Sequence, residues 1–222
     1  MNEATKAGVN RSHAPSFVQK MSFATLHLAV LFASAAVAFS ADLANPARAK
    51  ALVLVAALYF SRHMITLFYL LVRRVDWGEV LGLSAFMATF EVGFVWLAGQ
   101  SSAAFSALDV LGLGLLAFGS YLNTGSEVQR KWWKADPAHK GHCYTLGLFR
   151  YSMHINFFGD VVLFSGWALL TANLFALGLP LLMALMFIFL HIPGLDAYLA
   201  KRYGNEFTAY ASKTKKLIPF VY

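Results

Sequence analysis

Long apolar segments alternate with short polar ones along most of the chain. Six of them approach the length of a bilayer crossing, which takes about 20 mainly apolar residues. The fifth is short and needs residues from 151–156 to complete a crossing. The pattern therefore predicts an all-α, polytopic membrane bundle of about six transmembrane helices with a C-terminal tail. The six segments are residues 22–41, 50–72, 79–98, 105–125, 157–170 and 173–192.

Composition agrees with a membrane location. Of 222 residues, 59% are hydrophobic and only 13% are charged, too few to cover the surface of a water-soluble protein. Residues 1–20 are polar, include Pro15 and have no apolar core, which predicts a tail and not a cleavable signal. Residues 21–222 are predicted to form a single membrane-embedded domain.

Basic residues predict the orientation. They gather before the first segment, after the second, after the fourth and in the tail, whereas the turns at 99–104 and 171–174 contain no Lys or Arg. The positive-inside rule then predicts cytoplasmic N and C termini, in a bacterial inner membrane or the endoplasmic reticulum, with Arg48 and Lys50 as exceptions. The net charge of +7 on one face suits lipid headgroups or a phosphorylated cofactor. Nucleic acid is not expected, because topology accounts for the basic residues.

Charged residues also lie inside the spans. Arg62 and His63 are near the middle of the second span, and Glu91 is near the middle of the third. Antiparallel neighbours would place Arg62 and Glu91 at similar depth, where they could pair. Two interpretations stay open: a buried ion pair that only fixes helix register, or a residue that lines a substrate cavity.

A polar stripe leaves the fourth span at helical spacing and consists of Asn123, Glu127, Arg130 or Lys131, and Lys134. It predicts a solvated helix face or a binding site. A second set contains Arg150, Tyr151, His154, Asn156 and Asp160. An amide and a carboxylate one turn apart share a helix face and suit a ribose or a carboxamide, although Asn156 could instead cap the helix start.

Metal and disulfide chemistry are not expected. Cys143 is the single cysteine, so no intrachain disulfide can form. His139 and His142 lie close to it in sequence but lack a fourth ligand at suitable spacing for zinc.

The stretch GLFRYSMHINFFGD at 147–160, with the aromatic and basic tail that ends in TKKLIPFVY, resembles the C-terminal half of the steroid 5α-reductase superfamily. That superfamily includes sterol C=C reductases and isoprenylcysteine carboxyl methyltransferases. The resemblance covers about residues 105–222 and is closest to the steroid 5α-reductase C-terminal domain, of the DUF1295 type. Methyltransferase members resemble RHPxYxG here and use S-adenosylmethionine, whereas reductases carry Asn and then an acidic residue and use NADPH. The chain has Asn156 and Asp160, with Met153 and Ile155 in place of Arg and Pro. The resemblance therefore favours NADPH.

The resemblance also implies site residues. His142 stands where steroid 5α-reductases have an arginine, and Tyr198 is similar to a tail tyrosine that faces the cofactor. The implied NADPH-binding residues are Asn123, Glu127, Lys131, Lys134, His142, Arg150, His154, Asn156, Asp160 and Tyr198. The family's ketone-binding glutamate in a QELPS-like stretch has no counterpart before residue 79, so Glu91 is expected to replace it. Tyr59 and Arg62, in a stretch similar to the family's tyrosine-bearing helix, complete the expected catalytic set, with Tyr69 as a rival to Tyr59.

The resulting expectation is an integral membrane oxidoreductase that reduces a conjugated C=C bond of a steroid-like or other lipidic enone by hydride transfer from NADPH. Residues 21–104 would supply substrate-side helices and 105–222 the cofactor-binding half. The expected partners are a lipidic small-molecule substrate and membrane lipids, with no obligate protein partner. Two alternatives stay open: an S-adenosylmethionine-dependent lipid or isoprenylcysteine methyltransferase, and a non-catalytic membrane protein that binds lipid or cofactor.

Overall fold

The computed structural model describes residues 12–222, so the first eleven residues of the predicted tail lie outside the described part. This part contains helices and no strand, which confirms the all-α prediction. A shorter apolar helix, Ile155–Leu170, accompanies five helical segments that are long and apolar enough to cross a membrane, and the chain is therefore a multi-pass membrane protein. The five segments are Phe17–Ala38, Pro46–Leu70, Trp77–Gln100, Ala107–Ala135 and Leu174–Tyr203.

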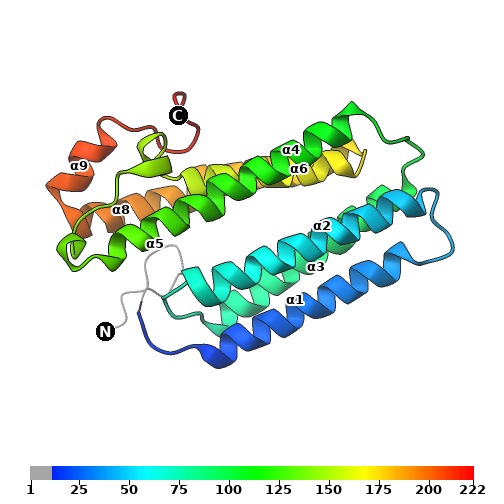
Figure 1. Ribbon diagram of the computed structural model, residues 1–222, viewed down its shortest axis with the longest axis horizontal. Helices are drawn as coiled ribbons and strands as arrows, with labels where there is room; N and C mark the ends of the chain where they lie inside the picture. The colour runs from blue at the N-terminus through cyan, green and yellow to red at the C-terminus, as the bar shows by residue number, and fades with distance from the viewer. Residues whose placement is uncertain (1–11) are drawn as a thin grey trace. The chain divides into compact units, whose positions relative to one another are not determined.

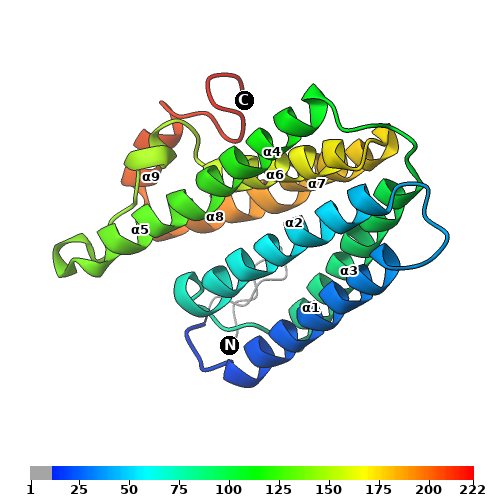
Figure 2. The same cartoon turned by 45° about the vertical axis from the view of Figure 1, so that its right-hand side comes forward.

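The chain forms two compact units (Figures 1 and 2). The first contains the described residues up to Leu115 together with Ser165–Leu179, and the second contains Leu116–Phe164 and Pro180–Tyr222. The helices α4 (Ala107–Ser120) and α6 (Ile155–Leu170) contribute residues to both units.

In the first unit α1 (Phe17–Ala38), α2 (Pro46–Met64) and α3 (Trp77–Gln100) pack against one another. Asn45 caps α2 by accepting a hydrogen bond from the backbone N–H of Arg48, and Pro46 occupies the first helical position. The helix continues as a π-helical segment, Ile65–Leu70. Large apolar side chains stay exposed on all three helices, as expected for helices that face lipid.

The Arg48 side chain is only 1% exposed, at the start of α2. Its guanidinium forms an ion pair with Asp109 of α4 and donates to the carbonyl oxygens of Ala104 and Leu170, each at 2.9 Å. A buried charge needs this degree of pairing. The Arg48 charge is therefore neutralised within the protein, which explains why this residue departs from the charge pattern of the other connections.

In the second unit α4 runs without a break through a π-helical segment, Tyr121–Gly125, into α5 (Ser126–Ala135). This continuous helix confirms that the polar stripe leaves the fourth span on a helix. The fifth span begins at Ile155, so it includes only two of the residues 151–156 that were expected to extend it. Short 3₁₀ turns cover Pro137–His139, Gly147–Arg150 and Leu174–Leu177. The remaining helical elements are α7 (Gly178–Met186), a π-helical segment Phe187–His191, α8 (Ile192–Tyr203) and α9 (Asn205–Ala211).

Two glycines bring α4 and α6 into close contact. A Cβ atom on Gly119 would lie 2.5 Å from the carbonyl oxygen of Gly159, and one on Gly159 would lie 2.5 Å from the backbone nitrogen of Asn123. Both distances are far below normal contact, so only glycine fits at either position without a shift of the backbone. This contact sets the spacing between Asn123 and the start of α6.

Candidate functional site

Three of the predicted cofactor-binding residues form one hydrogen-bonded chain. The Asn123 side-chain nitrogen donates to the backbone oxygen of Asn156 at 3.0 Å. The Asn156 side-chain nitrogen in turn donates to Glu127 Oε1 at 3.1 Å. Arg130 pairs with the second oxygen of the same carboxylate. Asn123 lies in the π-helical segment, a distortion often found at functional sites.

Asn156 is the second residue of α6, so it lies inside the helix and is not its N-cap. Its side chain is half-buried, and its amide nitrogen is the atom that bonds Glu127. A side-chain amide also has an oxygen, which can accept a hydrogen bond from an N–H or O–H group of a ligand. Asp160, also half-buried, follows one helical turn later, where the sequence places it on the same face.

His154 lies just before α6 and its side chain is only 2% exposed. Its Nε2 is 2.8 Å from Asp196 Oδ1 on α8, and the Lys216 ammonium is 3.6 Å from the other oxygen of that carboxylate. The backbone N–H of His154 also donates to the carbonyl oxygen of Lys216 at 2.9 Å, and Ser152 Oγ donates to that of Leu217 at 2.8 Å. His154 therefore fastens α8 and the tail beside the start of α6, and its contact with a cofactor stays a prediction.

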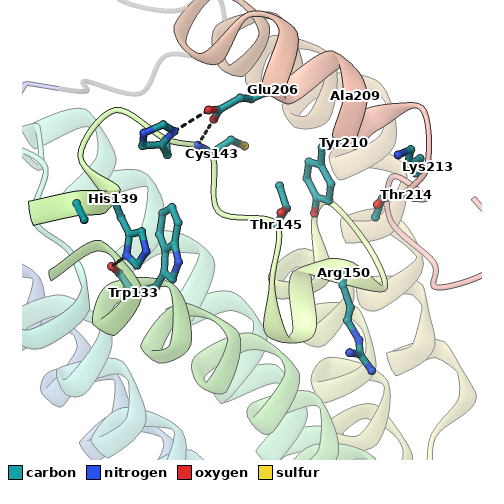
Figure 3. Close-up of a pocket in the computed structure, with 12 residues that line it drawn as sticks. Trp133, His139, Cys143, Thr145, Arg150, Glu206, Ala209, Tyr210, Lys213 and Thr214 are labelled. Atoms are coloured by element: carbon teal, nitrogen blue, oxygen red, sulfur yellow. Dashed lines mark hydrogen bonds and ion pairs between the residues drawn. The ribbon is translucent and has the colours of Figure 1, made fainter. Parts of the chain in front are cut away.

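A pocket of about 630 Å³ lies in the second unit (Figure 3). Two predicted residues, His142 and Arg150, line it, and Lys213 adds a further cation. Its hydroxyl groups come from Thr145, Tyr210 and Thr214. Cations and hydroxyl groups together are the donors that phosphate oxygens accept from.

The Glu206 carboxylate ties α9 to the connection before the pocket (Figure 3). It accepts a hydrogen bond from the backbone N–H of Cys143 at 2.8 Å and lies 2.6 Å from His142 Nδ1. These two hydrogen bonds, the first being the stronger influence, lower the pKa of Glu206. Burial raises the pKa values of the Cys143 thiol and the Tyr210 hydroxyl, so both groups are neutral at physiological pH.

Trp133 and His139 also line the pocket, and their rings stack with centroids 4.0 Å apart (Figure 3). The stack fixes His139, whose Nδ1 also lies 2.8 Å from the carbonyl oxygen of Trp133. Trp133 and His139 therefore form one packed aromatic wall of the pocket.

The other predicted cofactor residues on α5 and α8 do not line this pocket. The Lys134 ammonium donates to the Tyr203 hydroxyl at 2.8 Å, and the Tyr198 hydroxyl accepts from Arg202 at 2.8 Å. Lys131 is half-buried on α5. These contacts leave the predicted roles of Lys131, Lys134 and Tyr198 open.

The predicted catalytic residues lie in the first unit. Glu91 on α3 is fully buried and pairs with His27 of α1, whose Nε2 is 2.6 Å from Glu91 Oε1. Glu91 does not pair with Arg62, whose guanidinium lies 5.4 Å from the centroid of the Tyr59 ring. The physical reason is that α1 packs against α3 and brings a histidine to the depth of the carboxylate.

Sequence reasoning missed four residues. His27 was the most detectable, because a single histidine in an apolar span is costly unless it has a partner. Gln129 accepts a hydrogen bond from the backbone N–H of Leu148 at 3.0 Å and so fixes the turn before α6. Lys213 and Tyr210 line the pocket from the tail, which the sequence showed only as a segment rich in aromatic and basic residues.

A family described as "Protein of unknown function (DUF1295)" matches residues 79–214, more than half of the chain. The chain belongs to the DUF1295 family. In this DUF1295 protein the matched segment contains Glu91 and every predicted cofactor-binding residue, whereas His27, Tyr59 and Arg62 precede it. No curated protein matches the chain. Within residues 12–222 no group of three His, Cys, Asp or Glu side chains is placed to hold a metal ion.

Proposed function

We propose that this DUF1295 protein is an integral membrane oxidoreductase that uses NADPH to reduce the conjugated C=C bond of a steroid-like or other lipidic enone. The observation that carries the proposal is the hydrogen-bonded chain from Asn123 through Asn156 to Glu127, which holds the Asn156 side-chain amide in place at the start of α6. A carboxamide oxygen accepts hydrogen bonds from the amide N–H groups of a nicotinamide. The resemblance of GLFRYSMHINFFGD to the reductase branch supports the same assignment.

The pocket beside α9 supports a phosphorylated cofactor. Arg150 and Lys213 supply fixed positive charge, and Thr145 and Thr214 supply hydroxyl donors. Arginine binds phosphate through two parallel N–H donors, and lysine acts as a point charge. We assign the phosphates of NADPH to this pocket and its nicotinamide to Asn156.

NADPH would supply the hydride. The residues of the chain bind and orient it: Asn156 holds the carboxamide, and Asn123 and Glu127 hold Asn156. A lipidic enone enters from the bilayer, and its carbonyl needs a hydrogen-bond donor while negative charge develops on the oxygen. Glu91, Tyr59 and Arg62 are the proposed groups for that end of the substrate.

The test is NADPH binding to purified protein in detergent. Asn156→Ala should weaken NADPH binding at least about fivefold, because a bound amide would lose a hydrogen bond in a partly buried site. Asn205→Ala, an exposed asparagine at the start of α9, is the matched control and should bind like the wild type. Equal melting temperatures of the two variants establish that the fold is intact.

Two results would contradict the proposal. Unchanged NADPH affinity in Asn156→Ala removes the site assignment. Binding of S-adenosylmethionine by a wild-type protein that does not bind NADPH overturns the reductase and favours a methyltransferase.

A further inference from the structure

The last residues of the second unit, 218–222, form a small apolar loop that the proposed function does not use. Phe220 and Val221 at its tip are 79% and 70% exposed, and Ile218 and Tyr222 are 38% and 42% exposed. Figures 1 and 2 both show this loop, drawn in red at the end marked C, projecting from its unit. Exposed apolar side chains that lie together mark a surface that a membrane or another protein covers.

The backbone of the loop holds Phe220 in an unfavourable conformation. Its φ is 66°, in the left-handed region that is costly for a bulky side chain. Strained residues persist only where the surrounding structure fixes them, and they gather at functional positions. The Phe220 ring gains little packing in return, because it stays largely exposed beside the Tyr151 ring, at a centroid distance of 6.0 Å. Burial of the ring in an apolar environment outside the chain would offset the strain.

The loop also forms hydrogen bonds within its own backbone. The N–H groups of Leu217 and Ile218 both donate to the backbone oxygen of Tyr222 at 2.7 Å. The N–H groups of Val221 and Tyr222 donate in the other direction, to the Ile218 oxygen at 3.1 and 3.0 Å. Pro219 has no N–H to satisfy. Because unsatisfied backbone groups are what excludes loops from lipid, a loop with this backbone can enter the apolar edge of a membrane.

The base of the loop is fixed at the end of a membrane span. The backbone N–H of Met153, two residues before α6, donates to the carbonyl oxygen of Lys215 at 2.8 Å. The next residues along each segment, His154 and Lys216, repeat this contact at 2.9 Å. Leu217 follows and is only 1% exposed, so it packs the base against the protein. Since α6 is one of the apolar helices, these contacts hold the loop near the level at which α6 enters the membrane.

Basic side chains lie beside the loop. Lys215 is exposed and forms no ion pair with any residue from 12 to 222. The Lys216 ammonium lies 3.6 Å from Asp196 and is therefore partly neutralised. Apolar and basic side chains side by side are typical of segments that lie in the interface of a membrane that contains anionic lipids. Charge complementarity therefore selects the lipid surface in which the chain already lies as the occupant of this loop.

We propose that residues 218–222 insert into the membrane interface and that Lys215 binds the headgroup of an anionic lipid beside them. Phe220 and Val221 lie at the boundary between headgroups and acyl chains, and the Lys215 ammonium stays at the level of the headgroups. This anchor depends neither on NADPH nor on a substrate.

The experiment measures the depth of the loop in full-length protein by spin labelling. In a Cys143→Ser background, Val221→Cys carries a nitroxide on the loop, and Asn205→Cys carries it at an exposed control position at the start of α9. Both proteins are placed in nanodiscs of phosphatidylcholine, with and without phosphatidylglycerol. Molecular oxygen dissolves in the bilayer, whereas a nickel chelate stays in water. In discs with phosphatidylglycerol the label at 221 should be accessible to oxygen and protected severalfold from nickel relative to the control.

Two variants separate the apolar contribution from the charge. Phe220→Gly keeps the left-handed backbone without strain and removes the ring, so nickel should reach the label at 221 as easily as the control while the melting temperature does not fall. Lys215→Gln should reduce the protection in discs with phosphatidylglycerol and leave it unchanged in discs without. Lys140→Gln, which removes another exposed lysine of the same unit, is the matched control and should change neither.

Three results would overturn the inference. A label at 221 that is as open to nickel as the control shows that the loop lies in water. Protection from oxygen as well as from nickel shows that protein, such as a second copy of the chain, covers it. Equal protection in both kinds of disc, unaffected by Lys215→Gln, shows that no anionic headgroup is bound.

Discussion

Replacing Gly119 with alanine tests whether the close contact of α4 and α6 holds the candidate cofactor residues together. The new Cβ atom would lie 2.5 Å from the Gly159 oxygen and 2.7 Å from the Leu163 Cα, both backbone atoms that cannot rotate away. Normal contact begins at 3.4 Å, so the two helices must separate by about 1 Å at this point. The 3.0 Å hydrogen bond from Asn123 to Asn156 lies beside the contact and would lengthen beyond hydrogen-bonding range.

Two opposing terms set the size of the effect. Forcing an extra methyl group into a tight contact costs about 1–3 kcal/mol. Removing a glycine from a helix gains about 0.5–1 kcal/mol. The middle values of the two ranges give a net loss in free energy of unfolding of about 1.3 kcal/mol, which corresponds to roughly 2.5–5 °C in melting temperature for a chain of this size.

The assay is thermal unfolding in detergent, followed by circular dichroism. Gly114→Ala is the matched control, because Gly114 lies in the same helix and a Cβ atom there meets nothing within 4 Å. Gly114→Ala should raise the melting temperature slightly, and Gly119→Ala should lower it. If Gly119→Ala is as stable as Gly114→Ala, the close contact does not exist in the protein and the spacing argued for Asn123 and Asn156 fails with it.

Two further predictions concern charge. Asp109→Asn should cost about 3–5 kcal/mol in stability, because it leaves the buried Arg48 without its counterion. Asp76→Asn changes a partly exposed ion pair and should cost less than about 1 kcal/mol. Melting temperatures compare the two variants, and similar shifts would contradict the argument from burial. The pKa of Glu206 in the folded protein lies below its ordinary value of 4.5. The ionised Glu206 carboxylate therefore stabilises the connection before the pocket fully above pH 4.5, and this stabilisation is lost as the pH falls through the lower pKa of the folded state. As acidification protonates the Glu206 carboxylate, the hydrogen-exchange protection factor of the Cys143 amide should fall, and Glu206→Gln should remove this pH dependence. A fall that persists in Glu206→Gln would show that another group causes the pH dependence.

The sequence predicted the spans well because length and apolarity decide whether a helix crosses a bilayer. Each predicted segment overlaps an observed helix. The ends were less accurate where a helix continues beyond its apolar part. The sixth segment was predicted to end at residue 192, yet its helix continues to Tyr203, because an amphipathic continuation at an interface stays helical while its mean hydropathy falls.

Partner choice was harder to predict. The spacing of Asn156 and Asp160 predicted two polar side chains on one helix face, but it did not predict the hydrogen bond from Asn156 to Glu127. The π-helical turn at 121–125 rotates every later residue of that helix to a different position around the helix axis. Local helix propensity does not predict such a turn. Which residue pairs with Glu91 depends on the rotation of α1 about its own axis. The sequence does not predict that rotation, because a helix with apolar residues on every side has no distinct face to bury.

The buried Arg48 has a consequence for how the chain is made. Its carboxylate partner Asp109 follows 61 residues later, and the Leu170 carbonyl 122 residues later. At a synthesis rate of about 5–20 residues per second, the guanidinium waits roughly 3–12 s for its counterion and about twice as long for the carbonyl. Until then water at the membrane interface must solvate it. The start of α2 therefore reaches its final buried state only after α4 has been synthesised, and the order of assembly at this end of the first unit differs from the order of translation.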